Sequence, residues 1–442
     1  MTSLQDMVRV RQGVLSLVLF RDVLDDSVGR AWNTLVRLLL RTNATTTTTT
    51  AINITASADE IDAILIAYGE WMGALADRGM GWQEHLRDRI LSADNQFARQ
   101  AAIGEDVVPM VMDVARLDLQ ALQRVYSVVC EDVADWVRRL VPEVSDLPVW
   151  YDDVQMSDAP NDPFLKWFEV NDWGDYGVQL ASWYHRMGIG EFVRFRAFRY
   201  ENKQLIGLET PDPVVLEELV GYGWQQDALI KNTAALMAGL PALHVLLYGS
   251  RGSGKSSLVK ALLSRWSGNG LRLVEVMKSE LSGLSTLIEI LRGLPNKFII
   301  FVDDLSFEED DESYKSLKVV LEGTVTARAQ NIVVYATSNR RHLVREFYGD
   351  RPRPKDADEI HNWDTVQEKL SFSDRFGMTL TFEPANQETY LEIVSHLVRR
   401  SDLVIPSEDL EFRALQWATR NNGRSGRTAR QFVDFLIGER SV

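Results

Sequence analysis

The stretch Val245-Leu-Leu-Tyr-Gly-Ser-Arg-Gly-Ser-Gly-Lys-Ser256 decides the fold of the second half of this 442-residue chain. The apolar run Val245–Tyr248 precedes a match to the pattern GxxxxGK[ST], and the helical run Leu258–Leu263 follows it. In this context of strand, loop and helix, the glycines allow successive backbone N–H groups to point at phosphate oxygens. The sequence therefore predicts a phosphate-binding P-loop at Gly249–Ser256.

Two side chains complete the predicted loop. Lys255 is expected to reach the β- and γ-phosphates of a nucleotide, and the Ser256 hydroxyl is expected to coordinate Mg²⁺. The loop residues predicted to bind the nucleotide are Gly249, Ser250, Arg251, Gly252, Ser253, Gly254, Lys255, Ser256 and Ser257.

Short β-like runs alternate with helical segments from Val245 onward. Such alternation is typical of a parallel sheet covered by helices, so we predict an α/β module that ends in a helical lid. The strand candidates are Val245–Tyr248, Leu271–Val276, Phe298–Val302, Ile332–Ala336 and Thr379–Phe382. The lid candidates are the helices Gln387–Arg400, Leu410–Thr419 and Arg427–Ile437.

Two carboxylates follow the fully apolar run Phe298–Val302, as expected of a buried strand that delivers acids to the carboxyl edge of a sheet. Asp303 is expected to hold the metal through water. Asp304 stands where many ATPases keep a glutamate that orients the attacking water, and aspartate is one methylene shorter. Either the water is drawn closer, another acid such as Glu308 helps, or hydrolysis is slow. Glu308 begins an acidic run that is also typical of a solvated loop.

Further polar side chains have candidate roles. Asn339 follows an apolar strand and can polarise the attacking water, although Asn is also a common turn residue. Arg375 can act in trans as an arginine finger on the nucleotide of a neighbouring subunit, or it can form an internal ion pair with a structural acid. Arg427 and Arg430 lie on one face of the last helix at i, i+3, and one of them is expected to contact the γ-phosphate. We favour Arg427 by its position in the motif.

The first half of the chain has a different texture. Apolar residues recur with helical spacing, which predicts a mostly α-helical N-terminal domain, and the run Thr45–Thr50 is expected to be a loop between helices. Aromatic residues between Leu147 and Gly190 form either a docking surface or a second small core. The predicted boundaries are 1–190 for the helical domain, 191–215 for a β-hairpin and linker, 216–383 for the nucleotide-binding module and 384–442 for the lid.

The hairpin begins with Phe192–Tyr200, which alternates bulky and basic residues. Arg194, Arg196 and Arg199 could contact an anion there, but such alternation also arises on the solvated face of a strand.

Composition limits the classes of partner. The formal net charge of −15 argues against a large nucleic-acid surface, because neutralising phosphates needs clustered Lys and Arg. The single cysteine, Cys130, cannot form an internal disulfide, which fits a buried thiol in a reducing compartment. The early apolar run Gly13–Phe20 is too short to span a bilayer. We therefore expect a cytoplasmic protein with no membrane partner.

The chain order of the P-loop, acidic strand end, first sensor Asn339, arginine finger Arg375 and second sensor arginine resembles that of the AAA+ superfamily. More narrowly, Phe301–Glu309, Tyr335–Leu343 and Ser425–Phe432 are similar to a family of predicted bacterial ATPases classed as domain of unknown function 815. The resemblance implies binding of ATP, a requirement for Mg²⁺ and assembly into a ring or other homo-oligomer.

The resemblance also assigns the adenine contact, because AAA+ modules place such a motif just upstream of the P-loop. The segment Leu219–Tyr222 stands at that place, so Val220, Gly221 and Tyr222 are expected to pack on the base.

Three functions remain open. The first is an oligomeric ATPase that remodels or assembles a protein partner through the N-terminal domain. The second, motivated by Asp304, is a slowly hydrolysing nucleotide-dependent switch or scaffold. The third is a DNA-associated loader, in which Arg194, Arg196, Arg199 and the segment Arg351–Lys355 would contact phosphates.

Overall fold

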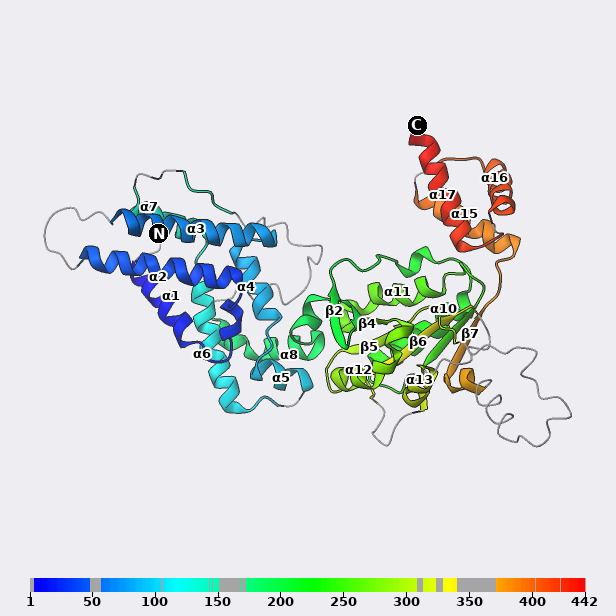
Figure 1. The fold of residues 1–442 in the computed structure, drawn as a ribbon, viewed down its shortest axis with the longest axis horizontal. Coiled ribbons are helices and arrows are strands. Elements are labelled where there is room, and N and C mark those ends of the chain that lie inside the picture. The colour runs from blue at the N-terminus through cyan, green and yellow to red at the C-terminus, as the bar shows by residue number, and fades with distance from the viewer. Residues whose placement is uncertain are drawn as a thin grey trace. The chain divides into compact units, whose positions relative to one another are not determined.

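The chain folds into two compact units, Met1–Arg194 and Phe195–Val442 (Figure 1). The computed structural model describes residues 4–47, 57–104, 106–142, 144, 146–150, 168, 172–307, 313–322, 329–339, 371–401, 403–421 and 423–441. Within these ranges, no helix is both long enough and apolar enough to cross a membrane.

The first unit is built from helices, which confirms the predicted fold class of this half. Its α-helices are α1 (Leu4–Ser16), α2 (Ser27–Thr47), α3 (Ala58–Arg78), α4 (Trp82–Leu91), α5 (Gln96–Ile103), α6 (Pro109–Tyr126), α7 (Cys130–Leu140), α8 (Gly177–Met187) and α9 (Glu191–Arg194). Short 3-10 turns occur at η1 (Arg21–Leu24) and η3 (Trp173–Tyr176). Local sequence sets the ends of α3, which starts at a Ser57–Glu60 capping box and ends at Gly79 with a φ of 64°.

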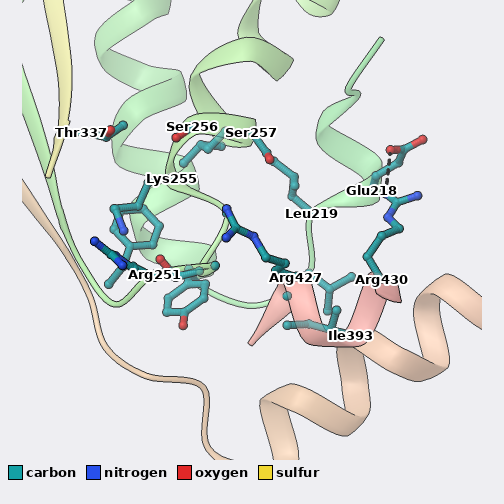
Figure 2. A pocket seen from close by; sticks show the side chains of 18 of the residues that line it. Glu218, Leu219, Arg251, Lys255, Ser256, Ser257, Thr337, Ile393, Arg427 and Arg430 are labelled. Carbon is teal, nitrogen blue, oxygen red and sulfur yellow. Dashed lines mark hydrogen bonds and ion pairs between the residues drawn. The ribbon is translucent and has the colours of Figure 1, made fainter. Parts of the chain in front are cut away.

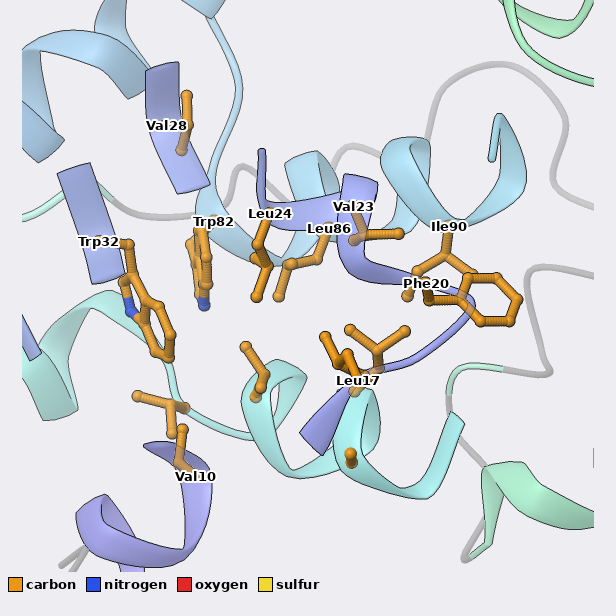
Figure 3. Close-up of a cluster of buried hydrophobic side chains, with 14 of the residues drawn as sticks. Val10, Leu17, Phe20, Val23, Leu24, Val28, Trp32, Trp82, Leu86 and Ile90 are labelled. Atoms are coloured by element: carbon orange, nitrogen blue, oxygen red, sulfur yellow. The ribbon is translucent and has the colours of Figure 1, made fainter. Parts of the chain in front are cut away.

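Aromatic side chains organise the core of the first unit. The rings of Trp32 and Trp82 stack with centroids 5.0 Å apart, and Trp71 meets Trp82 edge-on at 5.7 Å. Aliphatic side chains around Trp32 and Trp82 fill the rest of the cluster (Figure 3). Trp173 and Tyr184 are buried in the same core, whereas Trp150 is 37% exposed. The described aromatic residues Trp173 and Tyr184 of the segment after Leu147 therefore contribute to the main core of this unit.

A buried carboxylate holds the turn between α1 and η1. Oδ2 of Asp118 on α6 accepts hydrogen bonds from the backbone N–H groups of Val18, Leu19 and Phe20, at 3.0, 2.7 and 3.0 Å. These bonds satisfy donors that would otherwise be buried without partners.

The expectation of a loop at Thr45–Thr50 is wrong for its first residues, because α2 continues through Thr47. Threonine lowers helix propensity by only a few tenths of a kcal/mol per residue, and the apolar face of α2 keeps the helix packed upstream. Thr48–Thr50 lie outside the described residues.

The second unit contains a seven-stranded sheet in the order β2-β1-β4-β5-β6-β3-β7. Its strands are β1 (Ala197–Glu201), β2 (Gln204–Leu208), β3 (Val245–Gly249), β4 (Leu271–Val276), β5 (Lys297–Val302), β6 (Ile332–Ser338) and β7 (Met378–Phe382). All neighbours pair in parallel except β1 and β2. The five predicted strands correspond to β3–β7, and each differs by at most two residues at an end.

The hairpin differs from its prediction in two ways. Its first strand starts at Ala197 instead of Phe192, because pairing with β4 begins there and Glu191–Arg194 forms α9. The strand also joins the sheet, since β1 pairs with β4 in parallel, so the hairpin is not a linker separate from the module.

Helices cover both faces of this sheet. On one side α10 (Gly223–Met237) and α11 (Lys255–Trp266) share a buried cluster with alternate strand residues such as Leu247, Ile299 and Tyr335. On the other side lie α12 (Leu284–Leu291) and α13 (Ser313–Glu322) (Figure 1). Burial on both faces explains why β5 and β6 have continuous apolar sequences.

Three helices form the lid, as predicted. They are α15 (Gln387–Arg400), α16 (Ser407–Arg420) and α17 (Gly426–Ser441). The lid has its own core, in which Tyr390, Ala414 and Phe432 are buried. Short 3-10 turns in this unit are η4 (Leu216–Glu218), η5 (Ser267–Asn269), η6 (Lys278–Gly283) and η7 (Ser371–Arg375).

Candidate functional site

Glycines shape the loop between β3 and α11. Gly249, Gly252 and Gly254 have φ angles of 143°, 75° and 87°, which residues with a side chain rarely adopt. A Cβ at Gly249 would lie 1.9 Å from the carbonyl oxygen of Phe382, and Ser250 N–H donates to that same oxygen at 2.9 Å. The loop is thereby held by β7 at the N-terminus of α11, where backbone N–H groups and the helix dipole favour an anion.

Lys255 is the first residue of α11 and is only 6% exposed. Its Nζ donates to the carbonyl oxygens of Gly249 and Ser250, at 3.1 and 2.7 Å, and to Oδ1 of Asn339 at 3.3 Å. Burial lowers the pKa of Lys255, while the charges of Asp303 and Asp304 act in the opposite direction. The ammonium group therefore lies at the centre of the polar end of the site.

Asp303 follows β5 and accepts two hydroxyl hydrogen bonds. Its Oδ1 lies 2.6 Å from Oγ of Ser256 and 2.5 Å from Oγ1 of Thr337, and both hydroxyls donate. The pairing of Val302 with Ala336 explains this contact, because the next residue on each strand is Asp303 and Thr337. The register of two parallel strands thus brings the carboxylate of Asp303 and the hydroxyl of Thr337 together.

Asp304 has a left-handed backbone conformation, with a φ of 49°. Aspartate tolerates this region better than most residues. Its backbone N–H donates to Oγ1 of Thr337 at 2.9 Å, and its Oδ1 accepts from Nδ2 of Asn339 at 2.6 Å. The carboxylate of Asp304 is therefore oriented beside Asn339.

The lid contacts the P-loop through the start of α17. The backbone N–H of Arg427 donates to the carbonyl oxygen of Gly252 at 3.3 Å. A Cβ at Gly426 would lie 3.1 Å from that oxygen, and a Cβ at Gly252 would lie 2.9 Å from Oγ of Ser425. Glycine on both sides permits this close approach of lid and loop.

The two arginines of α17 point in different directions (Figure 2). Arg430 pairs with Glu218 of η4, with Nη2 3.5 Å from Oε2, and Arg400 of α15 pairs with the same carboxylate at 3.3 Å. Arg427 extends toward the P-loop, and among the described residues its guanidinium has no hydrogen-bond or ion-pair partner. Both arginines line the same cavity, and Arg427 is the one directed toward the P-loop.

These groups line one cavity of about 720 Å³ between the sheet edge and the lid. Its polar end contains Lys255, Ser256, Asp303, Asp304, Thr337, Asn339 and Arg427. Its less polar end contains Leu219, Val220, Tyr222, Gln226, Ile393 and Leu397, beside the ion-paired Glu218 and Arg430. A volume of this size lies within the range of ligand sites.

Comparison with models of known protein families shows to which family the chain belongs. The family described as "Protein of unknown function (DUF815)" matches residues 193–440, more than half of the chain. The chain belongs to this DUF815 family.

Solved structures give distant similarities to this DUF815 chain. The Holliday junction branch migration motor RuvB of Thermotoga maritima is similar at 16% sequence identity, with a TM-score of 0.32, over 51% of this chain and 72% of that chain. Two point variants of that protein give TM-scores of 0.32 and 0.31 at the same identity, over 51% of this chain and 72% and 73% of theirs. No curated protein matches the chain.

The strand order of this DUF815 chain is that of an AAA+ α/β module. The P-loop strand β3 lies between β6 and β7, and the acidic strand β5 lies beyond β6. A helical lid follows the last strand. The predicted fold class is therefore confirmed.

The predicted site residues separate into two groups in this DUF815 chain. Those that line the cavity are Arg251–Ser257, Val220, Tyr222, Asp303, Asp304, Asn339 and Arg427. Gly249, Ser250, Gly221 and Arg375 are not among the described residues that line it.

The second group has other roles. Gly249 and Ser250 lie behind Lys255 and accept its hydrogen bonds. Gly221 has a φ of 82°, and a Cβ there would lie 2.9 Å from Cγ2 of Thr389, so glycine lets this segment pass beside the lid. Arg375 forms an ion pair with Glu322 of α13, which is the internal pairing that we considered as its alternative role.

Two of the basic residues assigned to a DNA interface have acidic partners in the described structure. Arg199 lies 3.3 Å from Glu275, and Arg194 lies 3.3 Å from Glu191. Glu308 and the segment Arg351–Lys355 lie outside the described residues.

Sequence reasoning missed Thr337, Glu218 and Gln226. Thr337 stands two residues before Asn339 at the end of an apolar strand, a signal that could have identified it. Glu218 and Gln226 have no comparable local signal, because their roles depend on the lid and on the fold of the preceding loop.

The donor set fits Mg²⁺. Ser256 and Asp303 offer hydroxyl and carboxylate oxygens at the edge of the phosphate-binding loop, and Mg²⁺ prefers a few such protein oxygens together with water and phosphate oxygens. Among the described residues, no cluster of three or more His, Cys, Asp or Glu offers an alternative metal site.

Proposed function

We propose that this protein binds ATP with Mg²⁺ and hydrolyses it in the cavity between the P-loop and the lid. One observation carries the proposal: Asp303, held by Ser256 and Thr337, lies beside an Asp304–Asn339 pair and the buried Lys255. A buried cation, a carboxylate suited to a metal ion and a second, oriented carboxylate are the groups that phosphoryl transfer uses, and their proximity supports the proposal.

Each side chain has a separate role in this proposal. Lys255 exchanges its carbonyl partners for the β- and γ-phosphate oxygens, and Arg427 stabilises charge on the γ-phosphate from the lid. Asn339 orients the carboxylate of Asp304, which accepts a proton from the attacking water. Mg²⁺ held by Ser256 and Asp303 would neutralise developing charge on the phosphates. Val220 and Tyr222 contact the base.

The first test measures steady-state ATP hydrolysis and oligomer size in the same samples over a range of protein concentrations. Wild type, Lys255→Ala and, as a matched control, Lys260→Ala are compared. Lys260 lies on the same helix but pairs with Asp212 at 3.2 Å, outside the cavity. Turnover that is lost only in Lys255→Ala supports the proposal. Equal turnover in all three proteins, or no nucleotide effect in wild type, overturns it.

We propose further that the active form is a homo-oligomer in which Arg375 acts on the nucleotide of the neighbouring subunit. The side chain of Arg375 is 23% exposed and paired with Glu322, so it must leave this partner to reach another subunit. Mixing two inactive variants, Lys255→Ala and Arg375→Ala, distinguishes the two roles. Action in trans restores part of the turnover, because some interfaces combine an intact Lys255 with an intact Arg375. An internal structural role gives no recovery.

The first unit is proposed to bind the protein partner that the ATPase remodels or assembles. Exposed apolar side chains follow one another from the end of α5 into α6, where Ile103, Val108, Met110 and Leu117 are 61%, 50%, 75% and 65% exposed. Apolar residues exposed in one region are typical of interaction sites.

A slowly hydrolysing switch is the second candidate, and the short side chain of Asp304 favours it. Its hydrogen bond to Asn339 holds the carboxylate at the strand end, one methylene further from the γ-phosphate than a glutamate could reach. ATP-dependent assembly without turnover, and faster turnover in Asp304→Glu, would support the switch.

A further inference from the structure

The side chain of Gln226 is locked by the loop that lines the less polar end of the cavity. Its Nε2 donates to the carbonyl oxygens of Leu219 and Gly221, at 3.1 and 2.7 Å. Its backbone N–H also donates to the carbonyl oxygen of Tyr222, at 3.1 Å. Gln226 therefore belongs to the same rigid corner as the residues proposed to contact the base.

These partners determine which end of the amide faces which way. Both partners are carbonyl oxygens, which can only accept, so the amino end of Gln226 must face them. Both of its N–H groups are used by these two bonds. Oε1 is left as the polar atom that Gln226 offers to the cavity, since Gln226 lines it beside Val220 and Tyr222. Among the described residues, no donor bonds to this oxygen.

We infer that Gln226 selects adenine nucleotides over other purine nucleotides, by accepting a hydrogen bond from the 6-amino group of the base. This inference rests on the proposed function, because it assigns the base to the end of the cavity away from Lys255. Adenine presents N–H donors at position 6, whereas guanine and hypoxanthine present a carbonyl oxygen there. An acceptor fixed in place favours the 6-amino group of adenine and repels the 6-carbonyl oxygen of guanine and hypoxanthine.

The two hydrogen bonds that fix the amide of Gln226 make its discrimination between 6-amino and 6-oxo purines strong. A glutamine free to rotate could turn its amino end toward a 6-oxo base and donate to it, so it would bind 6-amino and 6-oxo purines alike. Rotating Gln226 would place its own oxygen against the carbonyls of Leu219 and Gly221 and would break two hydrogen bonds. When binding of the wrong ligand leaves buried polar groups of the site without hydrogen-bond partners, the site rejects that ligand strongly.

The test compares binding of three diphosphates by calorimetry in the presence of Mg²⁺: ADP, purine riboside diphosphate, which has only hydrogen at position 6, and IDP, which has oxygen there. We expect wild type to bind ADP about tenfold or more tightly than purine riboside diphosphate, and IDP most weakly. Gln226→Met, which keeps the length of the side chain without the amide, is expected to bind all three within about twofold of one another. Asp227→Asn, an exposed neighbour on the same helix, is the matched control and keeps the wild-type order.

The outcomes separate this inference from the proposed function. Binding of none of the three ligands by wild type overturns the proposed function. Equal binding of all three by wild type leaves that function intact and overturns the inference, even if Gln226→Met does not fold. A Gln226→Met protein that weakens all three ligands equally, and keeps the preference for ADP, shows that Gln226 only positions the loop.

Discussion

The hydroxyl of Thr337 lies 2.5 Å from Oδ1 of Asp303 and also accepts the backbone N–H of Asp304. One side chain at the end of β6 thus orients both carboxylates at the end of β5. The arrangement connects the metal-binding group and the proposed base, so neither can move without disturbing the other.

Thr337→Val removes the hydroxyl and keeps the shape of the side chain. We expect ATP turnover to fall about 10- to 100-fold, because outer hydrogen bonds of a metal site typically contribute that much, while ADP binding changes little. Thr379→Val on β7, where the threonine is exposed, is the control. Unchanged turnover in Thr337→Val would show that Ser256 alone orients Asp303.

Lys255→Met is expected to abolish nucleotide binding without lowering the stability of the ligand-free protein. Burial lowers the pKa of Lys255, so the charged group is retained at a cost that methionine does not have. The unfolded chain binds more protons than the folded one between this lowered pKa and 10.5. The stability of wild type relative to Lys255→Met therefore rises with pH in that window. Thermal melts from pH 7 to pH 10, with and without ADP, measure the loss of ADP binding and the pH dependence of stability. A large loss of stability of Lys255→Met at pH 7 would contradict the expectation that the ligand-free variant is as stable as wild type.

Glu218→Gln is expected to release nucleotide faster. Glu218 holds the lid through Arg400 and Arg430, and exposed ion pairs each contribute about 0.2–1 kcal/mol, so the loss of both pairs corresponds to a release of fluorescent ADP that is about two- to thirtyfold faster. Salt should accelerate release from wild type more than from the variant, because it screens these pairs. Glu217→Gln, the exposed neighbour, serves as the control, and identical release rates would exclude a role of the ion pairs.

Asp26→Asn is expected to destabilise the first unit in a pH-dependent way. Burial acts to raise the pKa of Asp26, but contact with His85, the backbone N–H of Gly29 and the charges of His85 and Arg89 lower it from 3.8 to about 2. A depressed carboxyl pKa contributes stability above pH 3.8 that is lost as pH falls through about 2, here about 2 kcal/mol.

Urea titrations at pH 7 and pH 2 measure this difference. Asp25→Asn is the control, because Asp25 and its partner Arg30 are each 70% exposed. A deficit in Asp26→Asn that is the same at both pH values would place the effect in packing and not in charge.

The outcome for the two arginines of α17 shows where sequence reasoning stops. Spacing placed Arg427 and Arg430 on one face of a helix, and motif position favoured Arg427. Their separation depends on Glu218, which lies more than two hundred residues earlier and meets Arg430 only when the lid is folded onto the module. A local pattern contains no information about that partner.

The sequence by itself determined the elements whose signals are local. Apolar runs marked β3–β7 because both faces of the sheet are buried, and the glycine pattern marked the P-loop because residues with a side chain rarely adopt its backbone angles. The tertiary structure alone decided which side chains meet: Thr337 with Asp303, Gln226 with the carbonyls of Leu219 and Gly221, and β1 with β4. These contacts follow from strand order, register and the position of the lid, which join residues far apart in the chain and leave no periodic trace in the sequence.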